Sequence, residues 1–387
     1  MKKKSISIVI GSKAQIEETK AKLKESPLMS GEVEVKTKEA NKWLGQQLTE
    51  GGLADSVDAT VTAREAKIKG ASMEILSIVR DWRTEVVGGM ETALLLWEAC
   101  VVPSLLHGSG TWKNITARTE KRMNSLQHWF TRLVLQLGPG APLAALSWDT
   151  GLIDMKLRVW REKLFMVLHL RSLCENSLAS KVYREQLDRG WPGLSQEVKL
   201  ICNKLEIEDC NTTKINKKEF KKIINEAIIK KNEEEIKIHA QGKTKCERIF
   251  SEKYGRKEYL GQKKIGEVRE YFRSRFGLQP FAGNYSNDKR FSRTGWLCRC
   301  GVKEVEGHLA TCQVYDDITA RYTNLKEDGQ LVSYYREVLE RRTLLDDQER
   351  EEQETRDQAL VVEPSITTDV CQYLRTGQSS QGCGVMD

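Results

Sequence analysis

Apolar side chains recur every three or four residues through much of the first half of the chain, which is the spacing of one face of an α-helix. The stripes are Ile68, Ala71, Ile75, Val79 and Trp82, then Met123, Leu126, Phe130, Leu133 and Leu137, and finally Leu157, Trp160, Leu164, Val167 and Leu168. Gly138-Pro139-Gly140 separates the last two helices, because proline removes a backbone donor. We therefore expect residues 51–180 to form a mainly α-helical unit.

The first 50 residues have a different pattern. Residues Ser5–Ile10 are rich in β-branched side chains, and apolar and charged side chains alternate in Glu32–Lys38, so each predicts a strand. The charged segment Ala14–Glu25 between them predicts a helix. Two strands alone are marginally stable in water, so we interpret residues 1–50 as the remnant of a larger α+β sheet.

Residues 181–290 are more polar and predict a basic helical region. From residue 211 to residue 300 there are 23 Lys and Arg against 11 Asp and Glu. The helix predicted around Lys217–Lys237 has only a narrow apolar stripe, formed by Phe220, Ile224 and Ile228, and we expect it to be exposed. The fold class predicted for the whole chain is mainly α, with a small N-terminal α+β part.

Charge is distributed unevenly along the 387 residues, whose formal net charge is +7. The basic middle predicts a segment that binds polyanions. Residues 346–387 are acidic and then rich in Gln, Ser and Gly, and they contain too few apolar side chains to offset their chain entropy. We expect this tail to be disordered.

Cysteine usage and the apolar runs indicate the cellular environment. The ten cysteines are sparse for a chain of this length, which favours a reducing compartment over a disulfide scaffold. The apolar run near the N-terminus ends before Gly11 and is too short for a signal peptide. The run around Ala93–Leu106 contains Glu98 and Pro103 and is shorter than a membrane span. We expect an intracellular protein of the nucleus or cytoplasm that is neither secreted nor membrane-bound.

The motif with the clearest chemistry is Cys298-Arg299-Cys300-Gly301 followed by His308 and Cys312. Three thiolates and one imidazole complete a tetrahedral zinc site that leaves no position open for water, so the predicted zinc ion is structural rather than catalytic. Gly301 permits a tight turn after the first pair, and a spacing of four would place His308 and Cys312 on one helix face. The alternative is that these cysteines are unrelated to each other and lie near a core histidine.

Cations and aromatic residues alternate before this motif, a mixture suited to phosphates and unpaired bases. The residues predicted to contact nucleic acid in this region are Lys263, Lys264, Arg269, Arg273, Arg275, Arg290, Arg293 and Trp296. The competing interpretation is an amphipathic helix in which Ile265, Val268, Phe272 and Phe276 belong to the core. For individual aromatic residues we favour the core, and for the basic surface we favour RNA or DNA as partner.

Other motifs predict no catalysis. Tyr315-Asp316-Asp317 resembles the metal-binding turn of polymerases in composition, but it lacks flanking strands, and we interpret it as the start of a helix. The histidines outside the metal motif have no neighbouring Ser, Cys or Asp arranged for nucleophilic catalysis. No phosphate-binding loop or dinucleotide motif is present, and we expect no small-molecule substrate.

The order of these parts resembles the region after the catalytic hairpin of non-LTR (LINE-type) retrotransposon reverse transcriptases. It is carried by ISIVIGSKAQ, by VEVKTKEANKWLGQQL and by LLLWEACVVPSLLHGSGTW, followed by the C-terminal Cys/His motif. The resemblance places Trp43, Leu44 and Gly45 near the primer grip, which makes Trp43 a further nucleic-acid contact. It makes residues 1–50 a palm remnant, 51–180 a thumb and connection region, 181–290 a basic region and 291–325 a CCHC zinc knuckle.

The resemblance implies an RNA-directed DNA polymerase whose catalytic aspartates, with their magnesium ions, belong upstream of the first strand. The predicted function is therefore that of a truncated reverse transcriptase fragment that binds nucleic acid but does not polymerise alone. One alternative is a host-retained, zinc-dependent module that binds nucleic acid or protein without enzymatic activity. Another is a non-functional remnant that exposes apolar faces in residues 50–180.

Overall fold

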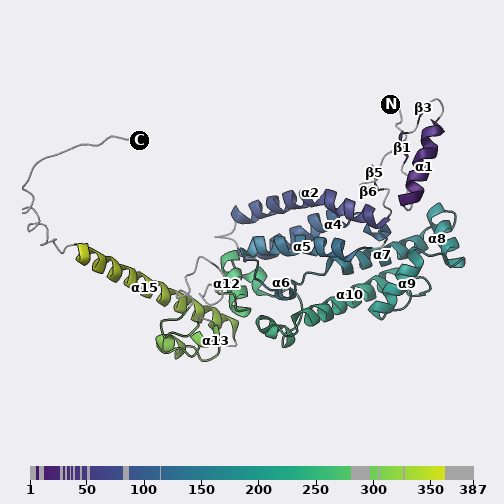
Figure 1. Cartoon of the computed structure of the whole chain (residues 1–387). Helices are drawn as coiled ribbons and strands as arrows, with labels where there is room; N and C mark the ends of the chain where they lie inside the picture. Colours follow the sequence, from purple (N-terminus) through teal and green to yellow (C-terminus); the bar gives the residue numbers. More distant parts are fainter. Residues whose placement is uncertain are drawn as a thin grey trace, which may run out of the picture. The chain divides into compact units, whose positions relative to one another are not determined.

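The computed structural model describes residues 6–7, 13–26, 29–30, 33–34, 36–37, 40–43, 46–49, 53–81, 87–113, 115–279, 297–303, 306–325 and 327–361. The chain divides into two compact units, Met1–Asn284 (unit 1) and Tyr285–Asp387 (unit 2). Most of the described residues are helical, as Figure 1 shows, and this confirms the mainly α fold class.

Short strands and one helix lie at the start of unit 1. The elements are β1 Ile6–Ser7, α1 Lys13–Glu25, β2 Met29–Ser30, β3 Val33–Glu34, β4 Lys36–Thr37, β5 Ala40–Trp43 and β6 Gln46–Thr49. Strand β1 pairs in parallel with β4, and β2 with β3 and β5 with β6 pair antiparallel. The predicted helix between two strands is present, because a parallel pair requires a crossover connection.

The strand β6 is attached to the first long helix, α2 (Leu53–Asp81). The backbone N–H of Gln47 donates to Thr60 Oγ1 at 2.8 Å, and the N–H of Thr49 donates to Ser56 Oγ at 2.9 Å. Hydroxyl groups of the helix thus satisfy backbone donors of the edge strand.

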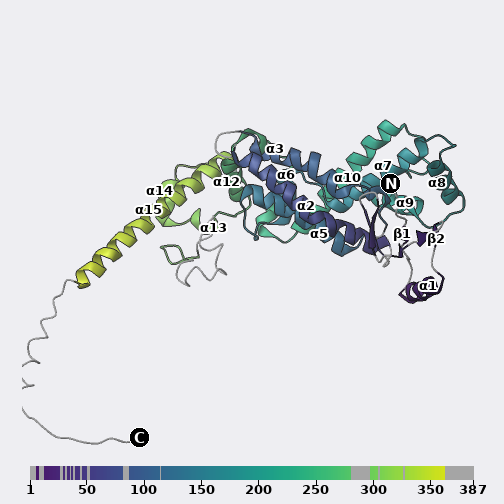
Figure 2. The same cartoon turned by 90° about the horizontal axis from the view of Figure 1, so that it is seen from above.

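Helices make up the remainder of unit 1. They are α3 Gly89–Leu96, η1 Trp97–Val101, α4 Val102–Leu106, η2 Ser109–Thr111, α5 Ala117–Leu135, α6 Leu143–Thr150, α7 Met155–Ser172, α8 Leu178–Asp188, α9 Leu194–Leu205, α10 Lys217–Ala240, η3 Thr244–Phe250, α11 Tyr259–Gln262 and α12 Ile265–Arg275. Side-chain caps fix several starts: Thr116 precedes α5, Asp154 precedes α7 and Asn216 precedes α10, each accepting a backbone N–H. Figure 2 shows α2 and α5 side by side.

The larger hydrophobic cluster of unit 1 is centred on Trp97 and Phe130, whose rings stack at 4.5 Å. Trp97 begins the π-helical turn η1. Pro103 has no N–H to donate to the carbonyl of residue 99, and the N–H of Val102 instead bonds to the carbonyl of Trp97, five residues back. The widened turn lies in a stretch, Gly89–Leu106, that is long and apolar enough to cross a membrane, and half of it is buried inside the structure.

The second hydrophobic cluster lies where α7, α8, α9 and α10 meet. It contains Leu157, Leu164, Val167, Leu168, Tyr183, Val198, Ile201, Cys202, Leu205, Cys210, Phe220, Ile224 and Ile228. The expectation that the lysine-rich helix would be exposed is wrong, because Phe220, Ile224 and Ile228 are fully buried here and Ile236 and Ala240 join the first cluster. The narrow apolar stripe is sufficient to pack α10 against the other helices, because it continues for the full length of the helix.

Unit 2 contains α13 Glu306–Leu309, η5 Gln313–Tyr315, α14 Asp316–Thr319 and α15 Asp328–Val361. The interpretation of Asp316 as the start of a helix is confirmed, since α14 begins there. The prediction that the tail is disordered from residue 346 is wrong for residues 346–361, because α15 continues through this acidic segment to Val361. Ion pairs at helical spacing, such as Arg356 with Glu352, support the helix there. Residues 362–387 lie outside the described residues.

Candidate metal centre and predicted nucleic-acid contacts

The first half of the Cys/His motif is a tight turn. The N–H of Cys298 donates to the carbonyl of Val302 at 2.7 Å, and the N–H of Gly301 donates to the carbonyl of Cys298 at 2.8 Å. Gly301 has a φ of +84°, in the left-handed region that favours glycine. The turn brings the thiols of Cys298 and Cys300 close together.

The second half of the motif is carried by α13 and the turn after it. His308 lies in α13, but the helix ends at Leu309, and Cys312 follows a turn in which the N–H of Thr311 donates to the carbonyl of His308 at 2.9 Å. The expectation that His308 and Cys312 share a helix face is therefore wrong. The turn nevertheless returns Cys312 to the other three residues.

The four ligand atoms lie within 4.8 Å of one another and could hold a metal ion. Cys298 Sγ is 3.5 Å from Cys312 Sγ, and Cys300 Sγ is 3.0 Å from His308 Nε2. Around a tetrahedral zinc ion, two thiolate sulfurs lie roughly 3.8 Å apart and a sulfur and an imidazole nitrogen roughly 3.6 Å apart. Shifts of an ångström or less would suffice, so the donor set fits zinc in type, number and spacing.

Burial differs among the four side chains. Cys298 and Cys312 are buried, whereas Cys300 is exposed. Burial raises the pKa of the Cys298 thiol to about 12, and a backbone hydrogen bond involving Val302 lowers the pKa of the Cys300 thiol. Cys300 thus favours a thiolate, while Cys298 favours a neutral thiol until a cation compensates its charge.

The candidate metal centre packs on the first turns of α15. Leu309 is fully buried, and its carbonyl accepts a hydrogen bond from the Tyr334 hydroxyl at 2.9 Å. Tyr315, Ile318 and Val338 are also buried in this small core. Because Leu309 lies between His308 and Cys312 in the sequence, a metal ion that fixes these two ligands would also fix Leu309 in the core.

Arg299, between two of the cysteines, pairs with acidic side chains of α15. Its Nη2 lies 3.3 Å from an oxygen of Asp346, and its Nη1 lies 2.5 Å from one of Glu349. The acidic segment therefore contacts the candidate metal centre within unit 2.

Four of the predicted nucleic-acid contacts lie at the surface of unit 1, around α12. Lys264 is exposed, and the ammonium group of Lys263 lies 4.5 Å from the centre of the Tyr271 ring. Arg269 bonds to the side chain of Gln136, and Arg273 donates to the backbone carbonyl of Gln136 at 3.3 Å. Both arginines are partly exposed, so they hold Gln136 and still present charge to solvent.

Arg275 is not a surface contact, and its assignment to nucleic acid is wrong. It is 7% exposed, and its guanidinium group binds Asp149 at 2.9 Å and also Glu252. Asp149 is fully buried and accepts a hydrogen bond from Tyr259 at 2.7 Å. Burial raises the pKa of Asp149, and the Arg275 charge opposes this rise. Arg275 is used to balance a buried carboxylate.

The competing interpretation of the α12 aromatics is confirmed, because Phe272 and Phe276 are buried together with Ile265 and Val268. The backbone of Trp43 pairs with Gln46 in the β5–β6 hairpin, while its side chain lies outside the described residues. Five further residues of the predictions lie entirely outside the described residues: Leu44, Gly45, Arg290, Arg293 and Trp296.

A surface that the sequence did not single out lies along α5, next to Gln136. Ser125, Trp129, Arg132 and Gln136 follow one another at spacings of three and four residues. This polar stripe lies opposite the apolar stripe that predicted the helix. Trp129, an aromatic residue within the polar stripe, was the sequence signal that could have identified this surface.

The chain matches no known protein family, and no characterised protein or solved structure has significant similarity to it.

Proposed function

We propose that the chain is a nucleic-acid-binding protein of the non-LTR reverse transcriptase kind, in which one zinc ion bound by Cys298, Cys300, His308 and Cys312 stabilises unit 2. The observation that carries the proposal is the convergence of these four ligand atoms within 4.8 Å. Zinc is favoured over other metals because a donor set of three thiolates and one imidazole selects it.

The zinc ion is proposed to act in folding. With four protein ligands, no coordination position is left for water or substrate. Leu309 of the small core directly follows His308 in the sequence, and its carbonyl accepts a hydrogen bond from Tyr334. Metal binding energy is therefore folding energy for unit 2.

Nucleic-acid binding is supported by the basic surface around α12. Without the buried Arg275, four predicted contacts around α12 have partly or fully exposed side chains: Lys263, Lys264, Arg269 and Arg273. Clustered Lys and Arg bind phosphates without sequence preference and with strong salt dependence.

The family assignment rests on the order of parts in the sequence, from the strands near Trp43 to the C-terminal Cys/His motif. Polymerisation in that family uses palm carboxylates that the resemblance places upstream of β1. The function proposed for this chain is accordingly binding of template or target nucleic acid.

The zinc proposal is tested by measuring the metal content of the purified full chain by mass spectrometry. One zinc per chain is expected, and Cys300→Ser should abolish it. Cys174→Ser is the matched control, because Cys174 is also an exposed free cysteine and lies in unit 1. Stoichiometric zinc in the Cys300→Ser variant would exclude the assigned ligand set.

The nucleic-acid proposal is tested by a salt titration of the full chain with single-stranded RNA and DNA. Lys263→Glu with Lys264→Glu should weaken binding and flatten the salt dependence, since each phosphate that is no longer neutralised lowers the slope by roughly 0.7 for a single strand. Lys181→Glu with Lys199→Glu makes the same charge change on exposed residues of α8 and α9. Equal weakening by both pairs would show only a general charge effect.

One observation favours the alternative of a zinc-dependent module that binds protein. Arg299 pairs with two carboxylates, Asp346 and Glu349, so the candidate metal centre of unit 2 already contacts one acidic protein segment, in α15. A chain that binds one zinc ion but neither RNA nor DNA at low salt would support this alternative.

A further inference from the structure

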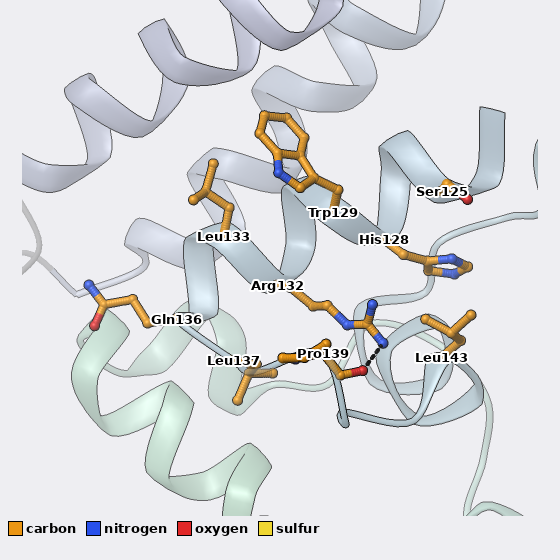
Figure 3. Close-up of a pocket in the computed structure, with 9 residues that line it drawn as sticks. All are labelled: Ser125, His128, Trp129, Arg132, Leu133, Gln136, Leu137, Pro139 and Leu143. Atoms are coloured by element: carbon orange, nitrogen blue, oxygen red, sulfur yellow. Dashed lines mark hydrogen bonds between the residues drawn. The ribbon is translucent and has the colours of Figure 1, made fainter. Parts of the chain in front are cut away.

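A pocket of about 470 Å³ opens at the C-terminal half of α5. Figure 3 shows its walls, which are Ser125, His128, Trp129, Arg132, Leu133, Gln136, Leu137, Pro139 and Leu143. Apolar and aromatic groups dominate these walls, and among the described residues no carboxylate lines them. Such a pocket suits a flat, uncharged or electron-rich group.

Hydrogen bonds fix the walls in place. Arg132 donates to the carbonyls of Pro139 and Ala141 at 2.9 and 2.7 Å, which holds the loop after α5 against the helix (Figure 3). His128 lies 3.1 Å from Ser147 Oγ. At the far end, Arg269 and Arg273 both bind Gln136. The pocket therefore exists before any ligand enters it.

A second hollow of about 440 Å³ lies on the other side of Trp129 and shares Ser125 and Trp129 with the first. Its other lining residues are Glu65, Lys69, Arg118, Lys121, Arg122 and Leu126. The α5 residues that line the two hollows, from Arg118 to Gln136, form a line along one face of the helix. This line is about 27 Å long at the helical rise of 1.5 Å per residue. Trp129 thus lies between the cations of the second hollow and Arg132 of the first pocket.

The charge of this line is only partly cancelled by its neighbours. Arg122 lies 3.6 Å from Asp58 and 3.4 Å from Glu65, so its charge is largely balanced. Arg118 and Lys121 are exposed, and the described part of the chain supplies neither with an ion-pair partner. Positive charge therefore remains at the N-terminal end of the line.

We propose that this face of α5 binds single-stranded nucleic acid, with phosphates on Arg118 and Lys121 and one unstacked base in the pocket against Trp129. At roughly 3.4 Å between stacked bases the line accommodates about eight nucleotides. Cations that track a backbone and an aromatic group that stacks a base are the two parts of such a site. The inference rests on the proposed function and adds a surface and a base-binding pocket to it.

The phosphate contacts are tested with the full, zinc-loaded chain and end-labelled oligomers of uridine and of thymidine, measured by fluorescence anisotropy. Arg118→Glu with Lys121→Glu should weaken binding at least tenfold and lower the salt slope by about 1.4, because two phosphates are no longer neutralised. Lys181→Glu with Lys199→Glu is again the matched control. A larger effect with the uridine oligomer would identify RNA as the ligand, and a larger effect with thymidine would identify DNA.

The base pocket is tested with an oligomer that carries one 2-aminopurine, whose fluorescence is quenched when it stacks on an indole ring. Quenching on binding is expected, with loss of quenching and about tenfold weaker binding in Trp129→Leu. Trp191→Leu is the control, since Trp191 is half exposed and lies after α8. Because Trp129 also touches the core, circular dichroism must show that the variant is folded. Unchanged quenching in folded Trp129→Leu would overturn the pocket assignment.

Failure of this inference is distinguishable from failure of the proposed function. If Lys263→Glu with Lys264→Glu weakens binding and Arg118→Glu with Lys121→Glu does not, the α12 surface binds nucleic acid and α5 does not. If the wild-type chain binds neither oligomer, both fail together.

Discussion

Unit 1 buries two extended clusters of apolar side chains, whereas the core of unit 2 is small and lies beside the four candidate metal ligands. In unit 1 the rings of Trp97 and Phe130 pack against residues from many helices. In the described part of unit 2 the buried side chains gather around Tyr315 and Tyr334. The comparison teaches that long helices packed together bury many apolar side chains, whereas a short segment has few of them to bury and gains most from a bound metal ion.

The comparison is tested most strongly by removing the metal. A chelator should unfold residues 297–325, because a structural zinc ion contributes roughly 10–16 kcal/mol of apparent binding energy near neutral pH. Hydrogen exchange measured by mass spectrometry should show reduced protection in this segment and unchanged protection in α10. Loss of zinc without faster exchange in residues 297–325 would show that the core of unit 2 folds by itself.

The second test acts on unit 1 alone. Trp97→Ala should lower the free energy of unfolding by about 4 kcal/mol, because it removes a fully buried indole and leaves a cavity. Urea denaturation measures the change, and the zinc content should stay the same. Trp191→Ala, which truncates a half-exposed indole, should cost about 0.5 kcal/mol or less. Similar losses for both variants would contradict the assigned core.

The third test concerns the buried charges of unit 1. Arg275→Ala should destabilise the chain by about 3 kcal/mol, because Asp149 would be left buried without its cation. Adding Asp149→Asn should restore part of the loss, since the remaining group is neutral. Denaturation of the single and double variants checks this. Weaker nucleic-acid binding by a folded Arg275→Ala chain would reverse the conclusion that Arg275 has no surface role.

The smallest expected effect is a pH dependence of unit 1. Burial lowers the pKa of His128 to about 4, with the nearby Arg132 as a second cause. Between this value and the unfolded value near 6.5 the unfolded chain binds a proton that the folded chain does not, so stability falls as the pH falls. About 2 kcal/mol should be lost between pH 7 and pH 5.

His128→Gln should remove this part of the pH dependence, because glutamine keeps a polar group near Ser147 and does not titrate. His169→Gln, at an exposed position of α7, should leave it unchanged. Denaturation curves recorded at several pH values give the comparison. An equal pH dependence in wild type and His128→Gln would contradict the assignment of His128 as a neutral, partly buried histidine.

The local parts of the structure were predictable from the sequence. The apolar stripes near Ile68, Met123 and Leu157 place α2, α5 and α7, because helical periodicity depends only on near neighbours. The cluster of four candidate metal ligands was also recognisable, since their spacing is short. The turn between His308 and Cys312 was not, because a spacing of four fits a helix and a turn equally well.

Contacts between distant residues could not be predicted. Arg275 looked like a surface cation because Asp149, its partner, is far away in sequence. The prediction that α10 is exposed was wrong for the same reason, since the residues that cover Phe220 come from other helices. Helix α15 continued past residue 346 because local ion pairs stabilise it, although composition indicated disorder.

Helix α10 has a consequence for the cooperativity of unit 1. Its first half belongs to one apolar cluster and its last turns belong to the other, and Asn232, between them, bonds to the carbonyl of Leu152 and the N–H of Asp154. Neither cluster can open fully without breaking the helix that the other one holds. The two clusters are thus one folding unit, and local damage to either is transmitted along the backbone to its neighbour.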